Sequence, residues 1–208
     1  MSVKIKICGL TRECDADAVN AAMPDYAGLV FYEKSRRCLT AEQAHKIRLR
    51  LSDDIKAVGV FVNMPPQKVA ELAKSVPLDI AQLHGEEDNA DIEKLRALCP
   101  ELEIWKAARV GDDFEKESLK EYSTADRLLL DAYVEGYGGE GKKIEDDKLE
   151  GINLSQIILA GGLNAWNIAD AINMFHPYGV DVSSGVETDD LKDEAKIKEI
   201  VDIVRKIK

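Results

Sequence analysis

Two side chains that could move protons each stand at the end of a short apolar run. Cys8 follows the run Val3–Ile7, and Asp131 follows the run Leu128–Leu130. A thiolate at such a position can act as a general base or a nucleophile, and a carboxyl group that its surroundings keep protonated can act as a general acid. The structural alternatives are a small buried thiol and an aspartate that caps the next loop. The two positions by themselves leave these alternatives open.

Three glycine-bearing segments follow one another in the later part of the chain, at residues 137–142, 160–163 and 183–186. Backbone N–H groups of such segments can approach an anion closely, because glycine places no side chain in the way. One segment alone could be only a turn. Three in succession predict a phosphate site, and we expect the acidic Glu140 to point away from the anion. The candidate phosphate-binding residues are Gly139, Gly141, Gly162, Ser184 and Gly185.

Four further residues could take part in such a site. Arg37 could bind a carboxylate through its guanidinium fork, although its neighbour Arg36 could do the same. Lys106 could form a Schiff base if it is desolvated, but a positioning or structural role is the alternative. We expect His84 to line the site or to be structural, and not to bind a metal. Asp181 lies within an apolar run, where it could support the site's hydrogen bonding or the fold itself.

The elements that must position these residues alternate regularly along the chain. Short apolar runs, typical of parallel strands buried on both faces, are separated by longer amphipathic stretches typical of helices. The expected strands are Val3–Ile7, Gly28–Phe31, Ala57–Val62, Ile80–Leu83, Ile104–Ala107, Leu128–Leu130, Ile157–Ala160 and Gly179–Val182. The expected helices include Thr40–Leu51, Pro66–Ser75, Asn89–Leu98 and Asp193–Ile207.

Eight strand–helix units in 208 residues predict a single-domain α/β fold over residues 1–208, a compact (β/α)8 TIM barrel. A doubly wound open sheet is the alternative, because spacing alone does not show closure. In a barrel, functional residues gather at the carboxyl ends of the strands. The polar and glycine residues that fall at these ends are Cys8, Arg37, Asn63, His84, Lys106, Asp131, Gly161, Gly162, Ser183, Ser184 and Gly185.

Composition excludes several classes of function. The formal net charge of −11 gives no basic footprint for nucleic acid. No apolar run approaches the roughly 20 residues that span a bilayer, and no secretory signal pattern begins the chain, so we expect no membrane association. The four cysteines are scattered, which favours a reduced, cytoplasmic setting and no metal site. We expect three of them, Cys14, Cys38 and Cys99, to be inert buried thiols.

Taken together, these residues resemble the phosphoribosylanthranilate isomerase family of tryptophan biosynthesis. The resemblance covers nearly the whole chain, and its segments occur in the family's order. They are Lys6–Thr11, Gly59–Asn63, Gln82–Gly85, Leu129–Asp131, Gly138–Lys142, Leu159–Asn164 and Val180–Glu187.

The resemblance implies a (β/α)8 barrel without a cofactor, acting on a small-molecule phosphosugar. It implies the Amadori rearrangement of N-(5-phosphoribosyl)anthranilate to the 1-deoxyribulose 5-phosphate derivative. Asp131 would be the general acid, Cys8 the general base and Arg37 the group that holds the anthranilate carboxylate, while the three late loops would clamp the phosphate. The chain departs from the family at Arg36, where proline is frequent, and at residues 144–146, which replace Phe-Asp-Trp.

Other functions remain open from the sequence. Another phosphosugar barrel is the nearest alternative, either indole-glycerol-phosphate synthase or an aldolase that uses Lys106. A non-catalytic phosphosugar-binding protein could keep the late loops, but it would not need both Cys8 and Asp131. The sequence does not distinguish a monomer from a homodimer.

Overall fold

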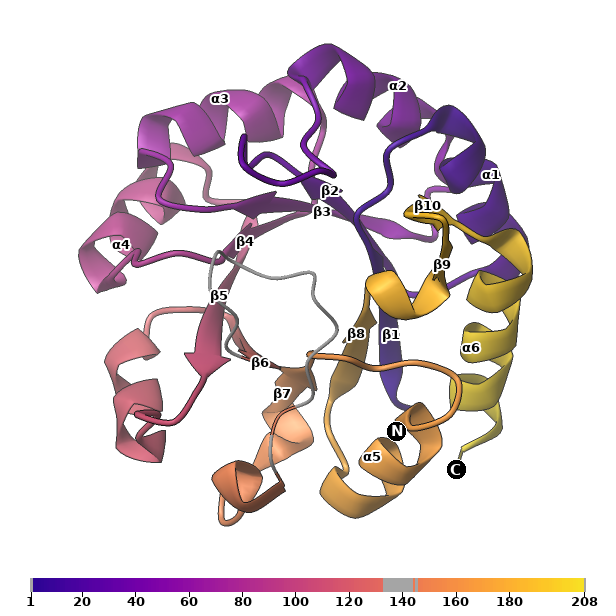
Figure 1. The fold of residues 1–208 in the computed structure, drawn as a ribbon. Helices are drawn as coiled ribbons and strands as arrows, with labels where there is room; N and C mark the ends of the chain where they lie inside the picture. The colour runs from indigo at the N-terminus through magenta and orange to yellow at the C-terminus, as the bar shows by residue number, and fades with distance from the viewer. Residues whose placement is uncertain (1, 133–143, 145, 208) are drawn as a thin grey trace.

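Eight parallel strands close into a barrel in the computed structural model, which describes residues 2–132, 144 and 146–207 (Figure 1). Strand β1 pairs with both β2 and β8, which closes the ring and excludes an open sheet. The strands are β1 Lys4–Cys8, β2 Tyr26–Val30, β3 Lys56–Phe61, β4 Ile80–Leu83, β5 Glu103–Val110, β6 Arg127–Ala132, β7 Ile157–Leu159 and β8 Gly179–Val182.

Helices surround this ring, as Figure 1 shows. Within the described residues the α-helices are α1 Glu13–Ala22, α2 Ala41–Arg50, α3 Pro66–Ser75, α4 Asn89–Leu98, α5 Ile168–Phe175 and α6 Glu194–Lys206. The expectation of an α-helix after every strand was wrong for β5, which is followed by the 3-10 helix η1 (Lys116–Tyr122). Only Leu119 and Tyr122 are large and apolar there, too few for the wide stripe that anchors an α-helix. The 3-10 helices η2 (Asp146–Leu149) and η3 (Leu154–Gln156) precede β7.

Local signals explain where the α-helices begin. The Thr40 hydroxyl accepts a hydrogen bond from the Gln43 backbone N–H, and the Gln43 side chain accepts one from the Thr40 N–H, which completes a capping box. Pro66 occupies the first turn of α3, where a missing N–H costs nothing. The predicted apolar stripe of α6 is confirmed, because Ile197, Ile200, Val201 and Val204 are all buried.

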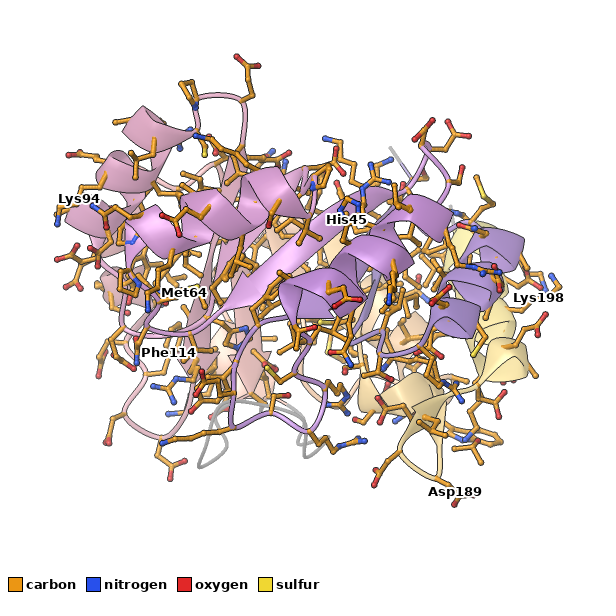
Figure 2. All side chains as sticks on the ribbon, turned by 90° about the horizontal axis from the view of Figure 1, so that it is seen from above. His45, Met64, Lys94, Phe114, Asp189 and Lys198 are labelled. Atoms are coloured by element: carbon orange, nitrogen blue, oxygen red, sulfur yellow. The ribbon has the colours of Figure 1, made fainter. Side chains whose placement is uncertain are left out.

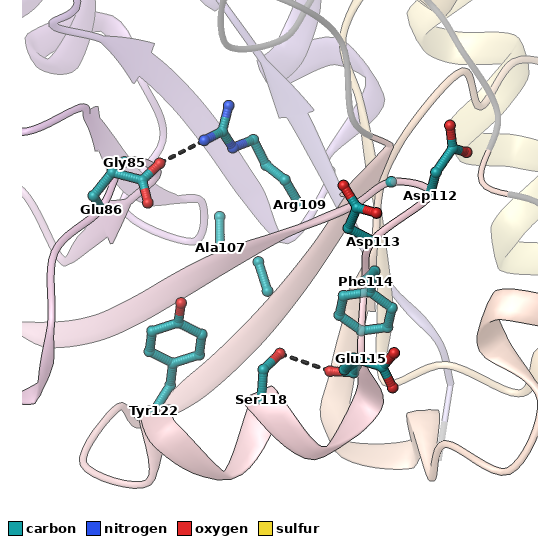
Figure 3. A pocket seen from close by; sticks show the side chains of 12 residues that line it. Gly85, Glu86, Ala107, Arg109, Asp112, Asp113, Phe114, Glu115, Ser118 and Tyr122 are labelled. Atoms are coloured by element: carbon teal, nitrogen blue, oxygen red, sulfur yellow. Dashed lines mark hydrogen bonds and ion pairs between the residues drawn. The ribbon is translucent and has the colours of Figure 1, made fainter.

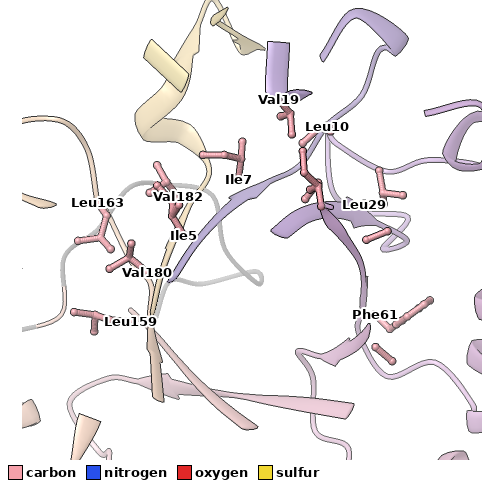
Figure 4. Close-up of a cluster of buried hydrophobic side chains, with 14 of the residues drawn as sticks. Ile5, Ile7, Leu10, Val19, Leu29, Phe61, Leu159, Leu163, Val180 and Val182 are labelled. Atoms are coloured by element: carbon pink, nitrogen blue, oxygen red, sulfur yellow. The ribbon is translucent and has the colours of Figure 1, made fainter. Parts of the chain in front are cut away.

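The buried apolar residues form two larger clusters, separated by the wall of the barrel, and a small third one of Cys8, Val30 and Val60. The largest cluster lies between strands and helices, and Figure 4 shows some of its members, such as Ile5, Ile7 and Leu29. The second cluster lies inside the barrel and consists of Tyr26, Val58, Ile80, Trp105, Ala107, Leu129, Ile158 and Ala160. Burial of each large apolar side chain contributes about 1.5–3 kcal/mol. Charged side chains such as Lys94 and Lys198 are exposed on the outer helices (Figure 2).

A short hairpin that the sequence did not predict follows β8. Its strands β9 (Glu187–Thr188) and β10 (Leu191–Lys192) pair antiparallel around Asp189 and Asp190. Both aspartates have positive φ angles, 50° and 64°, as a tight turn of this kind requires. Asp189 projects from the molecule at this turn in Figure 2. The hairpin carries Glu187 and Lys192 back to the end of the barrel where β1 and β8 finish.

Candidate active site

The alternation of side chains along the strands places polar groups inside the barrel, above its apolar layer. Residues two apart on a strand face the same side, so Lys6 and Cys8 of β1 both point inward. At the carboxyl ends of the strands these groups surround a cavity of about 90 Å³. Its lining consists of Cys8, Val30, Tyr32, Ser35, Arg37, Val60, Val62, Gln82, His84, Asp131, Asp181 and Ser183.

A buried ion pair between β1 and β8 lies next to Cys8 inside the barrel. The Lys6 Nζ lies 2.8 Å from Asp181 Oδ2, and the Lys6 side chain is fully buried. Burial raises the pKa of the Cys8 thiol above its ordinary value, and the Lys6 charge offsets only part of that rise. Burial by itself would lower the pKa of Lys6, but Asp181 and Cys8 raise it. The geometry therefore keeps the ammonium charged directly beside the thiol.

Asp131 faces a histidine across the cavity. His84 Nε2 lies 3.3 Å from Asp131 Oδ2, and His84 Nδ1 lies 2.9 Å from Gln82 Nε2. Gln82 is buried, so the amide fixes the plane of the imidazole ring. The ring lies next to the carboxyl group of Asp131, which lines the same cavity as Cys8. The two groups with proton-transfer chemistry thus approach one space from β1 and β6.

Arg37 is buried at the edge of this cavity and held by a carboxylate. Its Nε and Nη2 donate to Glu187 Oε1 and Oε2 at 2.8 and 2.9 Å. Gly9, with φ 84°, makes room for it, since a Cβ there would collide with Arg37 Cδ. The neighbouring Arg36 lies nearer the surface and pairs with Glu187 and Asp190. Arg37, and not Arg36, is therefore the arginine that reaches the cavity.

Two of the three late glycine segments pack against each other. Gly161 and Gly162 both have positive φ angles, and the amides of Asn164 and Asn167 donate to the Gly162 carbonyl at 3.1 and 3.0 Å. Gly185 approaches so closely that a Cβ there would collide with the Leu163 carbonyl oxygen. Ser184 begins the 3-10 helix η4 (Ser184–Val186). The predicted residues Gly139, Glu140 and Gly141 lie outside the described residues.

Lys106 and Asn63 were expected at the cavity but do not line it, and for Lys106 the structural alternative is the one that the contacts support. Lys106 lies on the outer face of β5, where its Nζ donates to the carbonyls of Gly85 and Ala107 at 2.6 and 3.1 Å and lies 3.4 Å from Glu87 Oε2. Glu87 also accepts from the backbone N–H of Asn63 at 2.6 Å. These residues brace the loop after β4. Because Lys106 is surrounded by acceptors in the wall of the barrel, it cannot reach a substrate as a Schiff-base lysine.

A larger cavity of about 590 Å³ adjoins the site beyond the ends of β4 and β5 (Figure 3). Arg109 pairs with Glu86 on one side of it, and Phe114, Ser118 and Tyr122 lie on the other. Its lining contains neither Cys8 nor Asp131. The smaller cavity is therefore the candidate active site, because the groups capable of proton transfer converge there.

Sequence reasoning missed several groups that the structure brings to the site. Lys6 and Gln82 stand two residues before Cys8 and His84, so the period of two along a strand would have placed them beneath those residues. Glu187 had no such local signal, because it reaches Arg37 only through the hairpin. Tyr32 lines the cavity from the loop after β2.

The other cysteines differ in their burial. Cys99 is buried as expected, but Cys14 is exposed and Cys38 is only partly covered. Cys14 occupies the outer face of α1, whose buried face is formed by residues such as Ala16 and Val19. Among the described residues, no group of three or more His, Cys, Asp or Glu side chains is arranged to hold a metal ion. No described helix is both long and apolar enough to cross a membrane.

A closed (β/α)8 barrel with a thiol, a carboxyl group and an arginine around one cavity at the carboxyl ends of its strands has the arrangement of a barrel enzyme whose side chains can transfer protons. The comparisons with known proteins narrow this class. The family model for N-(5'-phosphoribosyl)anthranilate (PRA) isomerase matches residues 5–203. The chain belongs to this family.

The relatives span the same length as this chain. An N-(5'-phosphoribosyl)anthranilate isomerase of Acetivibrio thermocellus is 46% identical over 97% of this chain and 95% of its own. The solved structure of the Thermus thermophilus isomerase is 30% identical with a TM-score of 0.85, covering 97% of this chain and 98% of its own. A further structure, an isomerase in complex with reduced 1-(o-carboxyphenylamino)-1-deoxyribulose 5-phosphate, is 33% identical with a TM-score of 0.81 and covers 99% and 100% of the two chains.

Proposed function

We propose that the chain catalyses the Amadori rearrangement of N-(5-phosphoribosyl)anthranilate to 1-(2-carboxyphenylamino)-1-deoxyribulose 5-phosphate in tryptophan biosynthesis. The observation that carries this proposal is the convergence of Cys8 from β1 and Asp131 from β6 on one cavity. The reaction needs an acid and a base in different protonation states, and a carboxyl group and a thiolate can supply both.

In the first step, Asp131 donates its proton to the furanose ring oxygen, the C1'–O bond breaks, and the sugar opens to a Schiff base. In the second, the Cys8 thiolate removes the proton from C2', and the electron pair of that C–H bond forms the enolamine. Tautomerisation then moves a proton from the enol oxygen at C2' to C1' and gives the ketone. The product keeps the Asp131 proton on O4', and the cycle closes when Cys8 releases its proton and Asp131 takes one up. His84, 3.3 Å from Asp131, holds the acid in place for the first step.

Both ends of the substrate are anionic, so each needs a local cationic or N–H-rich partner. We assign the anthranilate carboxylate to Arg37, whose guanidinium Glu187 fixes at the cavity edge. We assign the phosphate to Gly162, Ser184 and Gly185, together with Gly139 and Gly141. Asp181 Oδ1 is buried without a hydrogen-bond partner among the described residues, which suits an acceptor for a sugar hydroxyl.

The alternatives fit these contacts less well. An aldolase would require Lys106 in the cavity, whereas its ammonium donates to the carbonyl of Gly85 in the loop after β4 and to that of Ala107 in β5. A pure binding protein would have no use for a buried thiol placed on an ion pair. We propose a cytoplasmic location, which the four free thiols support, because a reducing compartment preserves them.

A fluorescence assay that follows consumption of freshly made phosphoribosylanthranilate tests the proposal. We expect the purified protein to turn the substrate over and Asp131→Asn to lower kcat by about 10²–10⁴-fold, the usual contribution of a general acid. Asp53→Asn is the matched control, because Asp53 is exposed in the loop before β3 and should leave the rate unchanged. A wild-type protein without turnover would refute the function, and a rate within a few-fold for Asp131→Asn would place the acid elsewhere.

A further inference from the structure

Lys6 is a buried ammonium group that the proton transfers proposed above do not use. Its side chain has no solvent exposure, and it lies on β1 one inward-facing position below Cys8. A buried lysine is costly unless its charge is compensated. Asp181 compensates it at 2.8 Å. The ammonium therefore lies beside an acid of β8 and on the same inner face of β1 as the Cys8 thiol.

The groups around Cys8 act on its charge in opposite directions. Burial disfavours the thiolate, and Asp181 disfavours it as well, because both are negative. Lys6 favours it from below, and Lys192 favours it from the hairpin above, where its Nζ also contacts Ser183 and Glu187. Arg37, from the loop after β2, interacts with the thiol too. Among these groups, Lys6 is the cation on the same strand and the same face as Cys8, one inward-facing position away.

We propose that Lys6 is a positioning residue that makes the Cys8 thiolate easier to form than burial alone would allow, with Asp181 as the counter-ion that keeps the ammonium charged. The proposal rests on the proposed function for its purpose, because a base that removes the C2' proton must be deprotonated first. It also explains why a fold with few charged side chains inside the barrel places a lysine there.

The test measures the thiol without substrate. Alkylation by iodoacetamide is followed against pH, and the rate at each cysteine is read by peptide mass spectrometry, so that exposed Cys14 serves as an internal reference. For Lys6→Met we expect the alkylation midpoint of Cys8 to rise by about 1–3 pH units, the usual effect of losing an opposite charge within about 4–6 Å. At pH 7.5 the Cys8 rate should therefore fall at least about tenfold.

Lys4→Met is the matched control. Lys4 is on the same strand and the same face, but it pairs with Asp25 at the other end of β1, about 13 Å from Cys8 by the strand rise. The control should leave the Cys8 midpoint unchanged. A midpoint that is equally unchanged in Lys6→Met, or one that shifts by the same amount in both variants, would overturn the proposal.

Because Lys6→Met leaves Asp181 buried without a partner, a second variant guards against misfolding. Lys6→Met/Asp181→Asn removes both charges, and we still expect a midpoint above that of the wild type, because the proposal requires the ammonium to outweigh its counter-ion at Cys8. An unchanged or lower midpoint in this folded double variant would contradict the assignment. Failure of the proposed function would show separately, as a wild-type protein that does not consume phosphoribosylanthranilate although its Cys8 midpoint responds to Lys6.

Discussion

The two ends of the barrel interior have opposite chemistry, although the same strands build both. At the amino-terminal end, Tyr26 and Trp105 pack edge to face with ring centroids 5.0 Å apart, and Tyr178 closes the layer with its hydroxyl 3.1 Å from that of Tyr26. At the carboxyl end, the inward positions carry Cys8, Gln82, His84, Asp131 and Asp181. One end is filled for stability and the other is left polar for chemistry.

A second contrast separates the inside of the barrel from its outer wall. Lys6 and Lys106 are both buried on strands, but they face opposite sides of the sheet. For Lys6, the charges of Asp181 and Cys8 overcome the cost of burial and raise its pKa. For Lys106, burial prevails over Glu87 and lowers the pKa. Inside the barrel, Lys6 stays charged beside the Cys8 thiol. In the wall, Lys106 braces the loop after β4.

The largest effect on stability is expected from the aromatic layer. Trp105→Ala should lower the free energy of unfolding by about 3–5 kcal/mol, because it leaves a cavity beside Tyr26. Chemical denaturation measures this loss. At temperatures where the variant is folded, kcat should stay within a few-fold of the wild type. A large drop in kcat for the folded variant would show that the amino-terminal end of the barrel interior also determines catalysis.

An acid-dependent effect is expected at the polar end. Burial alone would raise the pKa of Glu187, but hydrogen bonds from Arg37 and Lys192 lower it to about 2 from the ordinary 4.5. A lowered carboxyl pKa stabilises the fold above the unfolded value, and that stabilisation is lost as the pH falls from about 4.5 to 2. The shift corresponds to about 3 kcal/mol near neutral pH.

Glu187→Gln should therefore lose most of this stability at pH 7 and little of it at pH 2. Urea titrations of both proteins across this pH range measure the difference. A difference in unfolding free energy that does not change with pH would show that the charge of Glu187 is not what stabilises the site.

The smallest effect concerns the two neighbouring arginines. Arg37→Lys should raise KM about tenfold with kcat nearly unchanged, because a lysine cannot keep both the bidentate contact with Glu187 and a fork toward the substrate. Arg36→Lys should change KM less than about twofold, because exposed ion pairs contribute little. Steady-state kinetics measure KM for both variants. A larger rise in KM for Arg36→Lys than for Arg37→Lys would assign the substrate carboxylate to Arg36.

Much of this architecture follows from the sequence. The strand Ile80–Leu83 and the helices Pro66–Ser75 and Asn89–Leu98 have the predicted bounds, because their apolar pattern and caps are local. The closure of the sheet and the placement of Cys8, His84, Asp131 and Asp181 around one cavity also match expectation. The roles assigned to these residues stay predictions.

The remaining features depend on information that is not local. Parallel strands of a barrel are buried on both faces, so the apolar pattern does not show which alternate residues point inward. That ambiguity misplaced Lys106 and hid Lys6. The contact between Glu187 and Arg37 joins residues 150 positions apart through an unpredicted hairpin.

Single-turnover kinetics of Cys8→Ser with phosphoribosylanthranilate test the central claim most directly. The serine keeps the size and place of the thiol but does not ionise in this pH range, so the account predicts normal substrate binding and a loss of turnover of at least about 10²-fold. Turnover within a few-fold of the wild type would contradict it, because the proton at C2' would then be removed by another group.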